Sequence, residues 1–189
     1  MPGPASLVLA SRSPQRRAIL AQLGIDFTVE VPDVPELTQG APKELVTENA
    51  RRKARAVAGG RSSDEAVLGV DTAVVHGDRV LGKPRFEAEA RDFLELLSGG
   101  GHEVHSGLAL LFDGGERVGA TATRVEFREL GPADLDWYLA TGEWRERAGG
   151  YAIQGRGAAL VERIEGDYLG VVGLPVAELV RLAPELIRG

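Results

Sequence analysis

Short apolar runs alternate with segments in which apolar residues recur at helical spacing, and this pattern predicts the elements of the first half of the chain. The runs predict strands at 6–10, 27–31 and 66–70, the last of which ends at Asp71. Residues 72–76 continue in extended form to a predicted hairpin turn at 76–79. Helical spacing predicts helices at 15–23, 42–58 and 87–97. The second helix has one predicted apolar stripe, Val46, Ala50, Ala54 and Val57, and the third has predicted inward residues Ala90, Phe93, Leu94 and Leu97. Strands that alternate with helices in this way are typical of an α/β protein.

The second half of the chain predicts an antiparallel section. Two long β segments, 102–112 and 116–128, flank Asp113-Gly114-Gly115, which is typical of a hairpin turn. We expect further elements at 132–140 (a helix), 149–157 (a glycine-rich segment), 158–164 (a strand) and 175–186 (a terminal helix). No linker is long enough to divide the chain, so we expect one domain over residues 1–189.

The start of the chain predicts an anion site. Ser13 can cap a helix that Pro14 opens and Gly24 ends. The free N–H groups of such a helix start attract anions, and the hydroxyls of Ser11 and Ser13 and the guanidinium of Arg16 suit a phosphate. A capped helix followed by surface arginines is the alternative interpretation.

Composition narrows the class of protein. The 189 residues are 43% hydrophobic and 26% charged, which is enough apolar material for a core. A formal charge of −6 argues against general nucleic-acid binding but leaves room for a local basic pocket. Without cysteine, disulfides and thiol nucleophiles are excluded. Neither a membrane span of roughly 20 apolar residues nor a signal peptide is evident, so we expect a cytoplasmic location.

Several common motifs are absent. The chain has no GxxxxGK[ST] phosphate loop. Gly155-Arg156-Gly157 precedes a predicted strand rather than a helix, so it is not a dinucleotide fingerprint. His102 and His105 lie on opposite faces of their strand, which favours structural or exposed roles over a metal site.

Four charged residues at the ends of predicted elements remain as candidates: Glu36, Lys53, Asp71 and Lys83. Two carboxylates can hold a divalent cation and orient a water molecule, and lysines can neutralise phosphates. Each residue also has an ordinary interpretation. Asp71 is typical of a turn, and the lysines are typical of a solvated surface.

The same residues fall in seven sequence runs that together resemble one family. The runs are Ala10-Ser11-Arg12-Ser13-Pro14-x-Arg16, the loop residue Glu36, Ala50-Arg51-Arg52-Lys53-Ala54, Gly69-Val70-Asp71-Thr72, Leu81-Gly82-Lys83-Pro84, Gly150-Tyr151-Ala152-Ile153-Gln154-Gly155 and Val172-Gly173-Leu174-Pro175. In order and spacing, over nearly the whole chain, they resemble the Maf family of nucleoside triphosphate pyrophosphatases.

This resemblance implies a fold and a reaction. The fold is an elongated mixed β-sheet with flanking helices, in two lobes around a cleft, like that of inosine triphosphate pyrophosphatases. The reaction is hydrolysis of a nucleoside triphosphate to the monophosphate and pyrophosphate with Mg²⁺ or Mn²⁺, in clearance of the nucleotide pool. A homodimer is also implied. Thr72 and Gln154 resemble the branch that prefers dTTP and UTP, whereas another branch prefers 7-methyl-GTP.

The resemblance also implies a role for each candidate. The catalytic residues are Glu36, Lys53, Asp71 and Lys83. The substrate-binding residues are Ser11, Ser13, Arg16, Thr72 and Gln154, of which Thr72 and Gln154 read the base. Glu36 and Asp71 position the metal and the attacking water, with Asp71 favoured as general base, although the two carboxylates could exchange roles.

One residue departs from the family pattern. Gln15 stands where the family often has the first of two arginines, and Arg16 takes the second place. An uncharged amide can bond to phosphate but attracts it less, so we expect weaker triphosphate affinity. Arg17 could compensate, although it is rotated about 100° around the helix.

Two other functional classes stay open. A nucleotide-binding regulator of cell division would use the same pocket without turnover, but two carboxylates give a pure polyanion binder no advantage. A nucleic-acid binder is disfavoured by the acidic charge and by the lack of an aromatic and basic stripe.

Overall fold

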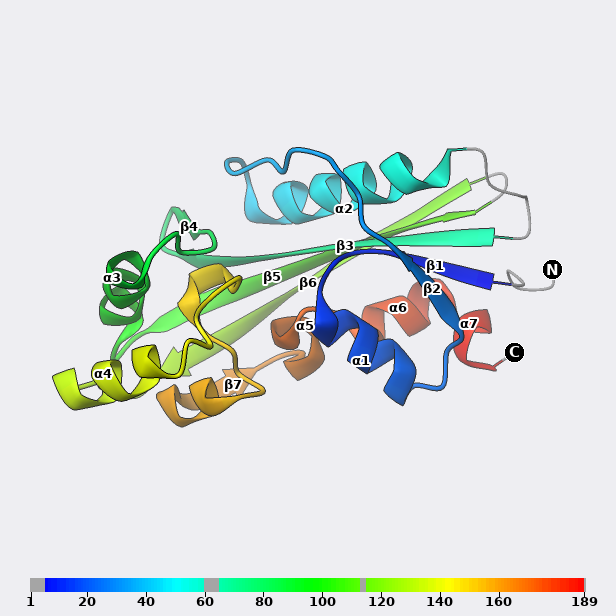
Figure 1. Ribbon diagram of the computed structural model, residues 1–189. Helices are drawn as coiled ribbons and strands as arrows, with labels where there is room; N and C mark the ends of the chain where they lie inside the picture. Colours follow the sequence, from blue (N-terminus) through cyan, green and yellow to red (C-terminus); the bar gives the residue numbers. More distant parts are fainter. Residues whose placement is uncertain (1–5, 60–64, 113–114, 189) are drawn as a thin grey trace.

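The computed structural model describes residues 6–59, 65–112 and 115–188, which form a mixed sheet with helices on both faces (Figure 1). The seven-stranded sheet has the order β2-β1-β3-β5-β6-β7, with β4 beside β3. The strands are β1 (Ser6–Ala10), β2 (Phe27–Glu30), β3 (Glu65–His76), β4 (Arg79–Leu81), β5 (Gly101–Phe112), β6 (Gly115–Phe127) and β7 (Val161–Glu165). The helices are α1 (Pro14–Gln22), α2 (Pro42–Ala58), α3 (Glu87–Leu97), α4 (Pro132–Ala140), α5 (Tyr168–Val172), α6 (Val176–Leu182) and α7 (Glu185–Arg188), with 3₁₀ turns η1 (Ala148–Gly150) and η2 (Arg156–Leu160).

The long strand β3 organises the sheet. One edge of β3 pairs with β5 from Val67 to Val75. The other edge pairs in parallel with β1 only as far as Gly69, and in antiparallel with β4 only from Val74 onward. Among the described residues, no strand therefore lies beside residues 70–73 of β3 on that edge. This opening between the end of β1 and the start of β4 positions the candidate site.

Helix α2 covers one face of the sheet at close range. A Cβ atom on Gly69 would lie 2.1 Å from the carbonyl oxygen of Ala50, and one on Gly107 would lie 2.6 Å from the carbonyl carbon of Val46. Glycine at both strand positions thus lets the helix backbone approach the sheet. The predicted apolar stripe of this helix is confirmed, since Val46, Ala50, Ala54 and Val57 are all buried.

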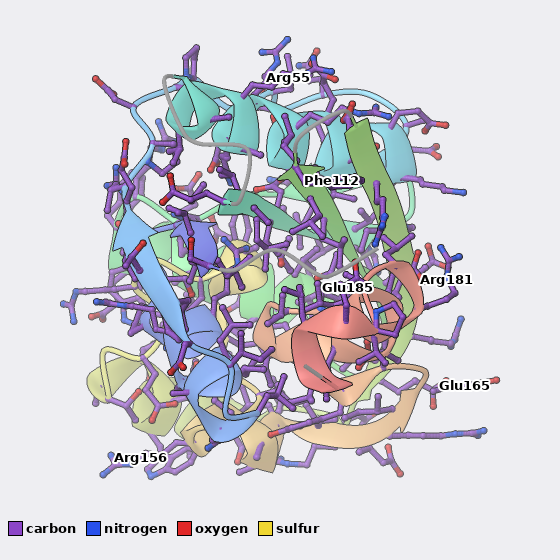
Figure 2. The ribbon with its side chains drawn as sticks, turned by 90° about the vertical axis from the view of Figure 1, so that its right-hand side faces the viewer. Arg55, Phe112, Arg156, Glu165, Arg181 and Glu185 are labelled. Carbon is purple, nitrogen blue, oxygen red and sulfur yellow. The ribbon has the colours of Figure 1, made fainter. Side chains whose placement is uncertain are left out.

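The remaining helices cover the opposite face and one end of the sheet. Figure 2 shows Arg55 of α2 and Glu185 of α7 on opposite sides of the strands. Two large apolar clusters lie there. One surrounds α1, α6, β1, the first half of β3 and the second half of β5. The other surrounds α3, α4 and the first half of β5. The predicted inward residues of α3 are buried in the second cluster: Ala90, Phe93, Leu94 and Leu97. Strands β3 and β5 contribute buried residues to both clusters.

The structure corrects several predicted boundaries. The predicted strand at 66–70 does not end at Asp71: it is continuous with the predicted extended stretch 72–76 as β3, which pairs with β5 through Asp71. The predicted hairpin turn at 76–79 is confirmed by the pairing of β3 with β4. Residues 158–160 belong to η2 rather than to a strand. The prediction of a single terminal helix was wrong, because the segment forms two helices, α6 and α7. Helix α6 ends before Ala183, whose backbone is not helical because Pro184 follows it.

Other differences are smaller. Helix α5 was not predicted; Asp167 caps it by accepting a hydrogen bond from the Gly170 amide. Strand β2 ends one residue early, at Glu30. In the predicted turn after Phe112, residues 113–114 lie outside the described residues. Among the described helices, none has the length and apolar character needed to cross a membrane.

His102 gives the fold a predicted dependence on pH. It is buried on β5, with its Nε2 2.8 Å from the Tyr151 hydroxyl, whereas His105 points the other way and pairs with Glu103. Burial, with a smaller effect from the charge of His76, lowers the pKa of His102 to about 4 from 6.5. The unfolded chain therefore binds the extra proton first as pH falls.

We expect about 3 kcal/mol of folding free energy to be present above pH 6.5 and lost as pH falls from 6.5 to about 4. Urea unfolding across this interval measures the loss. His102→Asn should flatten the slope between pH 6.5 and pH 4. An unchanged slope in that variant would show that other groups cause it.

Candidate functional site

A cleft of about 820 Å³ opens where β3 has no neighbouring strand. Its walls come from the start of α1, the loop before α2, the start of α2, the β3–β4 hairpin and the segment around η1. Within the described residues, five cationic side chains line it (Arg12, Arg16, Lys53, Lys83 and Arg147) against three acidic ones (Glu36, Asp71 and Glu146). This excess of positive charge suits a polyanion.

The α1 end of the cleft has the predicted helix start. Ser13 is the N-cap and accepts a hydrogen bond from the Arg16 amide. The Ser13 amide in turn donates to Ser11 Oγ at 3.2 Å. Gln15 also lines the cleft, and its amide oxygen accepts a bond from Ser13 Oγ. The helix terminus, both hydroxyls and this amide therefore share one wall.

Arg16 connects three parts of the chain. Its guanidinium donates to Gly173 O at 2.8 Å, Ser11 Oγ at 3.0 Å and Thr72 Oγ1 at 3.3 Å. Burial lowers the pKa of Arg16, opposed by the negative charges of Asp71 and Glu36. A guanidinium has five N–H donors, so it can hold this geometry and still donate to a ligand.

Thr72 is engaged inside the protein. Its hydroxyl is 3.0 Å from Ser106 Oγ, which donates to Gly170 O at 2.7 Å. The hydroxyl therefore belongs to a chain of hydrogen bonds from Arg16 to α5. Ser106 was not among the predicted site residues, because a serine in mid-strand carries no sequence signal of this kind.

The floor of the cleft holds a lysine between two carboxylates. Lys53 Nζ lies 2.6 Å from Asp71 Oδ1 and 2.6 Å from Glu36 Oε1. Lys53 and Asp71 are buried, whereas Glu36 is open to the cleft. Lys53 is thus not part of a solvated surface, as one interpretation of its arginine-rich helix proposed.

Asn49, one helical turn before Lys53, supports the same pair of carboxylates. Its Nδ2 donates to Asp71 Oδ2 at 3.0 Å and to Leu37 O at 3.0 Å, and its Oδ1 accepts from the Leu37 amide at 2.7 Å. Asn49 therefore orients Asp71 and fixes the loop that carries Glu36. Sequence reasoning missed it, although a polar residue within the apolar stripe of a helix, four positions before Lys53, was an available signal.

The electrostatics keep Glu36 ionised. Partial burial acts to raise the pKa of Glu36, but the charge and hydrogen bond of Lys53, with the charges of Lys83 and Arg16, outweigh it, so the pKa falls below its ordinary value. Asp71 receives one hydrogen bond on each oxygen. A carboxylate offers about four lone-pair positions, which leaves Asp71 able to accept a bond from water.

The far wall carries the remaining predicted residues. Lys83 is half-exposed, and its Nζ lies 3.2 Å from Glu146 Oε2. Gln154 is exposed and is one of the residues that line the cleft. All nine predicted site residues are among those that line this cleft: Ser11, Ser13, Arg16, Glu36, Lys53, Asp71, Thr72, Lys83 and Gln154.

The carboxylates of the cleft are candidate ligands for a divalent metal ion. No group of three or more His, Cys, Asp or Glu within residues 6–59, 65–112 and 115–188 is placed to hold one. Glu36 and Asp71 can supply oxygen ligands to a metal. Glu36 Oε1 and Asp71 Oδ1 each lie 2.6 Å from Lys53 Nζ, so the distance between these two oxygens is at most twice that contact. Mg²⁺ commonly takes one or two carboxylates and completes its shell with phosphate and water. The donor set fits such an ion shared with a phosphate ligand.

The fold and the cleft together define an α/β protein whose cleft holds two carboxylates, Glu36 and Asp71, among an excess of cationic residues. The comparisons with known proteins are more specific. Residues 6–186 match the family model described as Maf-like protein, and the chain belongs to this family.

Curated relatives carry one function name. A dTTP/UTP pyrophosphatase of Anaeromyxobacter dehalogenans is 47% identical over 182 residues, covering 93% of this chain and 91% of that protein. One of Symbiobacterium thermophilum is 47% identical with the same coverage, and one of Bacillus cereus is 44% identical, covering 93% of this chain and 87% of that protein. Among solved structures, the Staphylococcus aureus Ham1 protein aligns with a TM-score of 0.47 and 18% identity, covering 65% of this chain and 71% of that one.

Proposed function

We propose that the protein hydrolyses dTTP and UTP to the monophosphate and pyrophosphate. The observation that carries the proposal is Lys53, whose ammonium joins Glu36 and Asp71 at the floor of a cationic cleft. The relatives named dTTP/UTP pyrophosphatase support the choice of substrate. Cleavage of a phosphoanhydride requires bound phosphates, a positioned water and a proton acceptor, and the cleft contains candidates for each.

In this mechanism the α1 wall and the lysines bind the triphosphate. The backbone N–H groups of the helix start, with Ser11 and Ser13, donate to phosphate oxygens, and Lys53 and Lys83 neutralise charge. Arg16 holds this wall against β3. Gln154 offers a donor and an acceptor to the pyrimidine edge. Thr72 lines the cleft and accepts a hydrogen bond from Arg16, and its role in reading the base stays a prediction.

Asp71 accepts the proton of the attacking water. The water oxygen forms a bond to the α-phosphorus as the bridging bond to the β-phosphate breaks, and pyrophosphate leaves. Glu36 and Asp71 are the ligands that would hold Mg²⁺ or Mn²⁺. When bound, such an ion neutralises phosphate charge. The cytoplasmic location and the homodimer stay predictions.

A turnover panel tests the function. Purified protein with Mg²⁺ or Mn²⁺ is incubated with dTTP, UTP, CTP, 7-methyl-GTP, GTP, ATP and inosine triphosphate, and the products are separated by chromatography. Monophosphate and pyrophosphate from dTTP and UTP support the proposal. Preferred turnover of 7-methyl-GTP would overturn the role of Gln154 in base choice, and binding without any turnover would favour a regulator.

Gln15 allows a prediction about affinity. It lines the cleft beside Ser13, at the helix start that faces the phosphates. Gln15→Arg adds a charge-assisted donor there, so we expect KM for dTTP to fall by about threefold to tenfold. Gln22→Arg makes the same change at the exposed far end of α1 and should leave KM unchanged. Equal KM values for the Gln15→Arg variant and the wild type would contradict this prediction.

A further inference from the structure

The segment before η1 places two adjacent charged residues, Glu146 and Arg147, in the wall of the cleft. Glu146 has a φ of 59°, a left-handed conformation that is uncommon outside glycine. In extended chain, neighbouring side chains point to opposite sides. Here Glu146 and Arg147 both line the cleft. Strained backbone of this kind persists where the surrounding structure holds it, and it often occurs at functional sites.

Contacts on both sides fix this segment in place. The Gly149 amide donates to Gly82 O at 3.1 Å, next to Lys83. Gly149 also packs so closely on β3 that a Cβ atom there would lie 2.9 Å from Val74. The position of Arg147 is therefore tied to the same hairpin that carries Lys83.

Arg147 has no partner for its guanidinium within the described part of the chain. Its Nε is wholly buried yet makes no hydrogen bond. Three other cations of the cleft are paired: Lys53 with two carboxylates, Lys83 with Glu146, and Arg16 with three acceptors. The fourth, Arg12, is exposed to solvent. Burial lowers the pKa of Arg147, and Tyr138, Glu143 and Glu146 act in the opposite direction.

Only Nε of Arg147 is buried without an acceptor, so its other guanidinium nitrogens can donate to water or to a ligand in the cleft. Glu146, the adjacent carboxylate, is occupied by Lys83. The open space before Arg147 is the cleft, where the lining is already cationic. An anion that enters this space can accept from the guanidinium in the bidentate manner typical of phosphate.

We propose that Arg147 is a substrate-binding residue that contacts a phosphate group of the nucleoside triphosphate. The inference rests on the proposed function for the identity of the substrate. The contact itself requires only a polyphosphate anion in the cleft. Arg147 thus extends the phosphate site from the α1 wall to the far wall, beside Lys83.

The test compares Arg147→Gln with Arg147→Lys and with Arg145→Gln. Arg145→Gln removes the same charge two residues away, where the guanidinium stacks on Trp144 at 4.6 Å and does not line the cleft. Arg147→Lys keeps the charge and the side-chain stem, so it stays informative if Arg147→Gln does not fold. Two measurements are made on each protein: KM and kcat for dTTP, and calorimetric binding of inorganic tripolyphosphate.

We expect Arg147→Gln to raise KM and to weaken tripolyphosphate binding by about tenfold or more, as loss of a charge-assisted hydrogen bond does. Arg147→Lys should be intermediate, and Arg145→Gln should match the wild type. Wild-type KM and tripolyphosphate binding in both Arg147 variants would overturn the proposal. If the wild type binds tripolyphosphate but hydrolyses no triphosphate, the proposed function fails while the binding comparison still decides the role of Arg147.

Discussion

Asp71→Asn is expected to lower kcat for dTTP by about a hundredfold to ten-thousandfold, the range for loss of a general base. The amide has nearly the same size as the carboxylate, so its packing next to Lys53 and Asn49 is kept. It cannot take a proton from water at neutral pH. KM should change less than kcat, because Asp71 acts on water rather than on the phosphates in the mechanism proposed above.

Steady-state kinetics and thermal unfolding of the same preparation separate chemistry from stability. Asp78→Asn is the matched control, since it removes the same charge from the exposed β3–β4 turn outside the cleft. It should keep wild-type kcat. Full activity of Asp71→Asn with a folded protein would remove Asp71 from the chemistry. If Glu36→Gln also kept full activity, the mechanism that uses both carboxylates would be contradicted.

Gly69→Ala is expected to destabilise the fold by about 3 kcal/mol, the upper part of the range for overpacking, and to reduce activity with it. The added methyl group would lie 2.1 Å from Ala50 O and 2.8 Å from Ala54 N, both in the backbone of α2. The helix must then move away from β3. Because α2 carries Asn49 and Lys53, such a shift disturbs their bonds to Asp71, two residues along the strand.

Urea unfolding measures the stability loss, and kinetics on the folded fraction measure the loss at the site. Gly59→Ala is the control, because a Cβ atom there meets nothing within 4 Å and its backbone suits any residue. It should change stability by no more than about 0.5 kcal/mol. A Gly69→Ala protein as stable as this control would show that the helix has room to adjust.

Local signals predicted much of the fold. Hydrophobic spacing located α2 and α3 because each has one buried stripe, and the cap and proline located α1. The break between α6 and α7 and the whole of α5 were missed, since short helices carry too few residues for a periodic pattern. The continuity of β3 through Asp71 was missed because a polar residue inside a strand resembles a strand end until its partner strands are known.

The candidate site was predictable in its membership but not in its contacts. The family resemblance indicated the nine lining residues. The bridge from Lys53 to both carboxylates depends on the close approach of α2 to Gly69, which no local pattern contains. Arg16 and Thr72 bond to each other because three distant segments meet, so the sequence could not distinguish a residue that holds the site from one that reads the ligand. Arg147 gave no signal, because an arginine without a partner is visible only once its neighbours are placed.

In the proposed reaction, water attacks the α-phosphorus of a pyrimidine nucleoside triphosphate. Turnover of dTTP in ¹⁸O-labelled water, followed by mass spectrometry of both products, shows which phosphorus is attacked. We expect the label to enter thymidine monophosphate and the pyrophosphate to stay unlabelled. Label in the pyrophosphate, or release of inorganic phosphate and a diphosphate, would contradict it.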